Sequence, residues 1–178
     1  MTAPMTFADL ERMPDSNRRY EPRHGDLVEL APPKQEHLLI QRGLRRVLEK
    51  AAGGAGEVEI EVGFRPTPEH EYWKADVAFV SSERWLAIPR RGNLQGAPDL
   101  AIEVLSPSNT ASEILDKEQI CLENGAREFW VVDPIRRQVK VSGADGYAAT
   151  YKPGSPSRCR LEDRLAGPCR LIRYSSEA

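Results

Sequence analysis

Two apolar stretches of this sequence each carry a carboxylate where a buried strand would normally carry none. Residues 98–106 read PDLAIEVLS, and residues 73–80 read WKADVAFV. Their aliphatic and β-branched residues are typical of central strands in a sheet. Glu103 and Asp76 interrupt these stretches, and a carboxylate removed from water is costly unless a cation or hydrogen-bond donors meet it. The chain must therefore fold into a sheet that brings partners to both acids.

The pattern around these stretches predicts helices alternating with strands. Thr6 and Asp9 form an N-terminal capping pattern, and the glycines after residue 52 are typical of a helix end. We expect helices at 6–13, 34–52 and 110–124, and strands at 57–64, 73–80, 99–105, 127–133, 137–143, 147–152 and 169–174. The strand at 57–64 alternates Glu with Val and Ile, which places it near a sheet edge. The fold class that follows is α/β, with a mixed central sheet flanked by helices and additional C-terminal strands.

Length and composition indicate a soluble globular protein. The 178 residues fit one domain spanning 1–178, with 29% charged and 40% hydrophobic residues and a net charge of -2. No signal-peptide pattern or long apolar run is present, and three cysteines without a CxxC pair suit a reducing compartment, so we expect a cytoplasmic protein without membrane contact. The near-neutral charge argues against binding nucleic acid through an overall field, but local basic patches remain open.

The central acids have two interpretations. If neighbouring strands present Asp76 and Glu103 on one face, their oxygens form a pair suited to Mg²⁺ or Mn²⁺. Alternatively, each acid lies at a strand end, exposed or paired with an arginine. Asp99 shares the side of an extended strand that Glu103 occupies, and the spacing of the helix at 110–124 turns both Lys117 and Glu118 inward. Whether Asp99 and Glu118 belong to the site stays open. The simpler interpretation of Lys117 and Glu118 is a lysine that extends along the protein surface, or a salt bridge between these elements.

The stretches YEPRHGDLVEL, WKADVAFV, APDLAIEVLSPS and DKEQICLENGAREFWVVDP occur in this order and at these distances. With them the chain resembles the Uma-two family of restriction endonucleases, within the PD-(D/E)xK nuclease superfamily, over roughly residues 5–135. The resemblance implies a restriction endonuclease-like fold, in which a mixed sheet lies between two helices.

The resemblance also implies roles for individual residues. Asp76 and Glu103 would hold the metal, and Glu21 would be an additional acid at the site. Lys117 would be the basic member, supplied by the helix, because Leu105 stands where the superfamily usually has its lysine. His37 matches a family position and would touch the site, with a capped or core histidine as the alternative. The sequence departs from the family pattern at Lys74-Ala75, where proline is more usual before the aspartate, and at Cys121, where tyrosine is common.

The implied function is Mg²⁺- or Mn²⁺-dependent hydrolysis of DNA phosphodiester bonds by an endonuclease. In it, Lys117 would orient or deprotonate the attacking water. A homodimer would suit the cutting of both strands. The alternative is a catalytically inactive nuclease-fold module that serves binding or assembly, because a fold does not fix a function.

Overall fold

The computed structural model describes residues 4–14, 18–67 and 70–153. Helices and strands follow one another along the chain as the hydrophobic pattern predicts. The helices are α1 (Phe7–Glu11), α2 (Gln35–Ala52), α3 (Ser82–Leu86) and α4 (Ala111–Glu123). The strands are β1 (Arg19–Arg23), β2 (Asp26–Leu30), β3 (Gly56–Arg65), β4 (Trp73–Ser81), β5 (Leu94–Gln95), β6 (Leu100–Val104), β7 (Glu128–Asp133), β8 (Gln138–Gly143) and β9 (Ala148–Tyr151).

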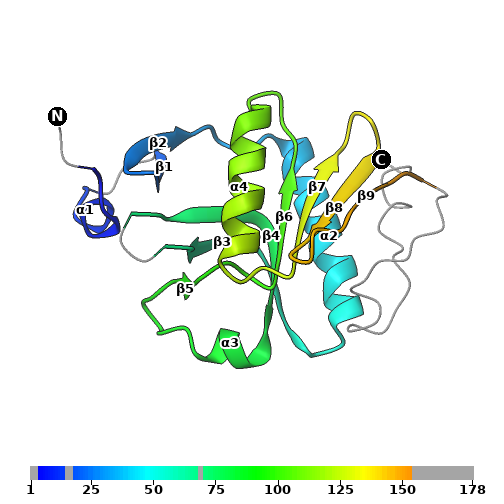
Figure 1. Ribbon diagram of the computed structural model, residues 1–178, viewed down its shortest axis with the longest axis horizontal. Helices are drawn as coiled ribbons and strands as arrows, with labels where there is room; N and C mark the ends of the chain where they lie inside the picture. The colour runs from blue at the N-terminus through cyan, green and yellow to red at the C-terminus, as the bar shows by residue number, and fades with distance from the viewer. Residues whose placement is uncertain (1–3, 15–17, 68–69, 154–178) are drawn as a thin grey trace.

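Seven of these strands form one mixed sheet in the order β5-β3-β4-β6-β7-β8-β9. The pairs β3·β5 and β6·β7 are parallel, and the other neighbours are antiparallel. Helices α2 and α4 lie on opposite faces of this sheet (Figure 1). The predicted α/β class with a helix-flanked mixed sheet is therefore confirmed, and β3 lies next to the edge as its alternation indicated. The strand expected at 169–174 lies outside the described residues.

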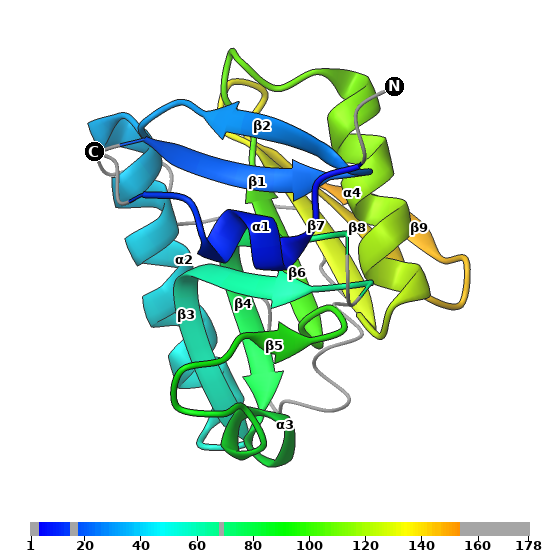
Figure 2. The same ribbon diagram turned by 90° about the vertical axis from the view of Figure 1, so that its left-hand side faces the viewer.

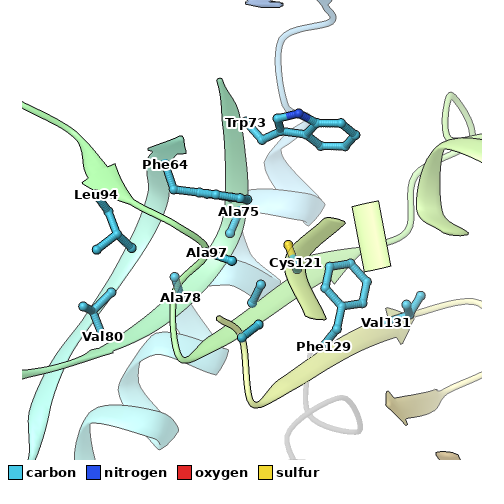
Figure 3. Packing of buried hydrophobic residues seen from close by; sticks show 12 residues of the cluster. Phe64, Trp73, Ala75, Ala78, Val80, Leu94, Ala97, Cys121, Phe129 and Val131 are labelled. Atoms are coloured by element: carbon cyan, nitrogen blue, oxygen red, sulfur yellow. The ribbon is translucent and has the colours of Figure 1, made fainter. Parts of the chain in front are cut away.

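Each face of the sheet has its own hydrophobic cluster. The cluster on the α2 side contains Leu44, Leu48, Ala52, Val58, Val77, Phe79, Leu100, Ile102, Val104, Trp130 and Val141. The cluster on the α4 side contains Phe64, Trp73, Ala75, Ala78, Val80, Leu94, Ala97, Ala101, Cys121, Ala126, Phe129 and Val131 (Figure 3). Strand β6 is buried along its whole length because it contributes to both clusters.

Strands β3 and β4 change faces at the same point. Val58 of β3 belongs to the α2-side cluster, whereas Phe64, an even number of residues later, belongs to the α4-side cluster. Side chains of a regular strand keep to one face at even spacing, so the strand must rotate between these residues. Glu61 lies at the change, and its φ is 58°, a left-handed conformation that non-glycine residues seldom adopt. The register places Asp76 opposite Glu61, but the ladder skips this pair.

Local capping fixes α4, and a hairpin closes the end of the sheet beside it. The Thr110 hydroxyl accepts from the Glu113 amide, and the Glu113 carboxylate accepts from the Thr110 amide, which is a complete capping box. The β1–β2 hairpin extends from the α2 side to the α4 side over the sheet end (Figure 2). It is joined to the sheet by the Tyr72 amide, which donates to the Pro22 carbonyl at 3.1 Å. The hairpin thereby carries Glu21 into the interior, where the residue is 1% exposed.

Candidate active site

Asp76 of β4 and Glu103 of β6 lie beside each other where their two strands separate. The antiparallel ladder ends at the Val77–Ile102 pair, one step before the two acids. Beyond it, the Asp76 amide points to Glu103 Oε1 at 3.4 Å, and the Val104 amide donates to Asp76 Oδ2 at 2.7 Å. Side-chain carboxylates thus take hydrogen bonds that a regular ladder would give to carbonyls. The opened ladder places the two acids next to each other.

Lys117 of α4 is the cation that meets Glu103. Its ammonium lies 2.8 Å from Glu103 Oε1 and also donates to the Lys74 carbonyl of β4. The lysine side chain is 7% exposed and the glutamate side chain 8%. The ammonium therefore does not extend along the surface into water, because α4 directs it through the interior to the end of β6. The inward position that the helical spacing predicted for Lys117 is confirmed.

Helix α2 supplies two further contacts to Asp76. His37 Nε2 lies 3.0 Å from Asp76 Oδ1, and Gln41 Nε2 donates to the same oxygen at 3.0 Å. The two residues are one helical turn apart and so share a face of α2. His37 thus contacts an acid of the site and is not a core histidine, whereas the sequence had given no reason to select Gln41.

Glu61 of β3 is a further acid near Asp76, and the sequence patterns did not identify it. Its Oε1 accepts from Gln41 Nε2 at 3.0 Å, and its Oε2 is paired with the Arg19 guanidinium. Strict alternation of Glu57, Glu59 and Glu61 placed all three on the outer face of a strand. The left-handed φ of Glu61 overturns this for the last of them, since it turns the side chain toward α2. No sequence motif identifies such a residue. The signal that could have found it is the pairing of the two strands, which puts Glu61 opposite Asp76.

Glu21 is buried near the other acids, but both of its oxygens have partners within the protein. Oε1 accepts from the Lys74 amide at 2.9 Å, and Oε2 accepts two hydrogen bonds from Arg23, at 2.7 and 2.9 Å. The guanidinium of Arg23 also lies 4.8 Å from the Trp73 ring centroid. Glu21 therefore fixes the backbone of Lys74, the residue whose carbonyl accepts from the Lys117 ammonium.

Burial and contacts with one another shift the pKa values of four side chains at the site, which are those of Glu103, Asp76, His37 and Lys117. Burial raises the pKa of Glu103 to about 7, against the opposing charge of Lys117. Burial also opposes ionisation of Asp76, yet the hydrogen bond with His37 and the charge of Lys117 outweigh it and lower the pKa of this carboxyl. The hydrogen bond with Asp76 raises the pKa of His37. Although burial opposes its charge, nearby carboxylates raise the pKa of Lys117, with Glu103 first among them.

Two residues that the sequence left open lie away from this cluster. Asp99 precedes β6, and its Oδ2 accepts from the Ser81 amide at 3.0 Å and from Arg84 at 3.1 Å. It therefore belongs to an arginine-paired group at the opposite end of β6 from Glu103. Glu118 turns to β8, where Lys140 donates to its Oε2 at 2.8 Å.

The oxygen atoms at the site are of the kind that a hard divalent cation prefers as ligands. In the described ranges, no group of three or more His, Cys, Asp and Glu side chains forms a ready cage for a metal ion. Mg²⁺ does not require one, because it is usually bound by one or two carboxylates with water and substrate phosphate oxygens. Moreover, Gln41, whose Nε2 donates to Asp76, has a buried Oε1 without a hydrogen-bond partner among the described residues. Carboxylate and amide oxygens of this kind fit Mg²⁺ or Mn²⁺.

Comparisons with known proteins bear on the family and the fold of the chain. A family model described as "Uma2: Putative restriction endonuclease" matches residues 7–165. A crystal structure from Anabaena variabilis, titled as a putative nuclease belonging to DUF820, superimposes with a TM-score of 0.78 at 18% identity and covers 95% of this chain and 97% of its own. No curated protein matches the chain. Over the described residues, none of the helices combines the length and the apolar character needed to cross a membrane.

Proposed function

The chain belongs to the Uma2 family of restriction endonucleases, and from this premise we propose that it is a Mg²⁺- or Mn²⁺-dependent endonuclease that hydrolyses phosphodiester bonds in DNA. One observation carries the proposal: Lys117, Glu103 and Asp76 come from three different elements and meet at one place, with 2.8 Å between the ammonium and Glu103. Burying two acids and a lysine together costs stability, and buried charged clusters with shifted pKa values gather at functional sites, which supports the proposal.

Asp76 and Glu103 are the residues that would hold the cation. When bound, the cation supplies a Lewis acid for a phosphate oxygen and lowers the pKa of its water. Lys117 would orient that water and stabilise the negative charge that develops on the phosphate. We assign it the role of donor rather than base, because its ammonium already donates to Glu103 and to the Lys74 carbonyl. Glu21 would act as a positioning residue through the Lys74 backbone.

A plasmid-nicking assay tests this proposal. Supercoiled plasmid is incubated with the full chain in Mg²⁺, in Mn²⁺ or in chelator, and wild type is compared with Glu103→Gln and Lys117→Met. We expect nicking only with metal and a loss of at least about 100-fold in both variants, the magnitude typical of removing one group that stabilises transition-state charge. Glu118→Gln is the matched control, because this acid neighbours Lys117 in sequence but pairs with Lys140. Chelator-resistant nicking that both variants retain would refute the proposal.

The second candidate is a catalytically silent module with the same fold. It is favoured by the hydrogen bonds that already engage both oxygens of Asp76 and by the ion pair that engages Glu103. The two candidates differ in metal affinity. Calorimetric titration with Mn²⁺ and Mg²⁺ should show binding by wild type that Glu103→Gln weakens. An absence of binding at millimolar concentrations, together with an absence of nicking, would favour the silent module.

A further inference from the structure

We propose that the turn between β7 and β8, residues 134–137, positions duplex DNA beside the candidate active site, with Ile135 packed in a groove of the duplex and Arg137 on a phosphate. The inference rests on the proposed function for the choice of DNA, but it concerns a surface to which that function gives no role. It makes Ile135 and Arg137 positioning residues for the substrate.

The turn lies at the end of the sheet that carries the two acids. Strands β6 and β7 are parallel, and Val131 of β7 is the register partner of Glu103. Figures 1 and 2 show the turn at the end where β6 finishes and α4 begins. At about 3.3 Å per residue and about 4.8 Å between strands, Ile135 lies roughly 10–15 Å from Glu103. This corresponds to about three or four base pairs of about 3.4 Å, so a duplex with one phosphate at the acids can reach the turn.

Ile135 is an apolar side chain that the hydrophobic clusters do not use. It is 85% exposed, and the two arginines that follow it, Arg136 and Arg137, are exposed as well. Single exposed hydrophobic residues are common on protein surfaces, so exposure alone assigns no role. Here the apolar tip stands next to two cations at the edge of a candidate site. Duplex DNA matches this combination, because apolar side chains enter its grooves while arginines neutralise its phosphates.

The turn is held in one conformation by its own residues. Asp133 is 6% exposed, and its Oδ1 accepts from the Arg136 amide at 2.9 Å while its Oδ2 accepts from the Arg136 guanidinium at 3.0 Å. Asp133 and Gln138 are register partners and close the turn, and Arg137 adopts a left-handed φ of 51°. A surface that is ordered in advance loses little conformational entropy on binding, so the contacts that it makes are retained as affinity.

Arg137 is the cation of the turn that is available to a phosphate. The Arg136 guanidinium is engaged by Asp133. Arg137 is exposed, and within the described ranges no acid forms an ion pair with its side chain. The planar guanidinium presents paired N–H donors that match the oxygens of a phosphate. The two arginines therefore have different roles, since Arg136 fixes the turn and Arg137 contacts the substrate.

The opposite end of the sheet supplies matched controls. Leu86 of α3 is 83% exposed, and Arg90 is exposed in the loop that follows this helix. This end is remote from the acids, because α3 begins directly after β4, where the Ser81 amide donates to Asp99 ahead of β6. Leu86 and Arg90 thus match the turn residues in character and exposure but not in position.

The test is the affinity of the full chain for a short fluorescently labelled DNA duplex, measured by anisotropy in chelator at several salt concentrations. Ile135→Ala should weaken binding at least about tenfold with an unchanged salt dependence, as expected when an isoleucine no longer leaves water. Arg137→Ala should weaken binding and lower the slope of log affinity against log salt by about 1. Leu86→Ala and Arg90→Ala should bind as wild type does, and thermal unfolding establishes that each variant is folded.

The plasmid-nicking assay with Mn²⁺ adds a second readout. Because the turn contacts the duplex away from the reacting phosphate, both turn variants should raise KM and leave kcat unchanged. Folded turn variants that bind and nick as wild type does would overturn the inference, while the proposed function stands. Equal losses of affinity in the turn variants and in the controls would also overturn it. Losses confined to the turn variants, in a chain that binds DNA but never nicks it, would uphold the turn and refute the proposed function. A wild type that neither binds nor nicks DNA would overturn both.

Discussion

Replacing Glu103 with glutamine should make the stability of the metal-free protein less dependent on pH. Burial raises the pKa of Glu103 to about 7 in the folded state, whereas a glutamate in an unfolded chain titrates near 4.3. Between these values the folded state binds more protons than the unfolded state, so stability is fully present below the unfolded pKa and falls as the pH rises through the folded one. At about 1.4 kcal/mol per pKa unit, the loss between about pH 5.5 and 8.5 is about 2 kcal/mol.

Urea unfolding in chelator at these two pH values, followed by circular dichroism, measures this loss. Wild type should lose about 2 kcal/mol more than Glu103→Gln as the pH rises. His37, whose pKa is raised, also contributes stability that is lost with rising pH, but it is present in both proteins and cancels in the comparison to first order. Glu118→Gln should behave as wild type. Equal losses in wild type and Glu103→Gln would show that Glu103 does not hold its proton in the folded state.

Three further predictions concern the scaffold. Thr110→Ala removes the capping box of α4 and should lower the free energy of unfolding by about 1 kcal/mol in a urea titration, an effect that Glu113→Ala should reproduce in part. Arg84→Ala takes a partner from buried Asp99 and should cost about 1–3 kcal/mol while calorimetry finds Mn²⁺ affinity unchanged. Gly56→Ala would place a Cβ 2.2 Å from a backbone oxygen of β4, and thermal unfolding should reveal a loss of about 1–3 kcal/mol or more.

The sequence was sufficient for most of the fold because local signals and burial agree there. The capping box at Thr110 and the left-handed Gly53 fix helix ends that the sequence shows directly. The apolar run at 100–104 is a buried central strand because it packs on both faces. The two-residue strand β5 was not predicted, since it lies within a stretch rich in Pro, Gly and Arg and pairs only through tertiary contacts.

The site was predictable only where its residues interrupt an apolar pattern. Asp76 and Glu103 stand out in central strands, and Lys117 stands out on the buried side of a helix. Glu61 was assigned to an outer face because alternation assumes a regular strand, and a positive φ at a glutamate leaves no mark in the sequence. Gln41 was missed because a single amide on a helix is ordinary until the structure shows what it contacts.

The rotation of β3 and β4 at Glu61 and Asp76 also affects how the protein unfolds. The segment before the rotation packs against α2, and the segment after it packs on the α4 side, so this pair of strands is shared by both hydrophobic clusters. Opening it would expose both clusters together, which makes a small local opening at the site unfavourable. The backbone amides of β3 and β4 that are paired on either side of Glu61 and Asp76 should accordingly exchange their hydrogens only on global unfolding, so the carboxylates keep their positions for as long as the protein stays folded.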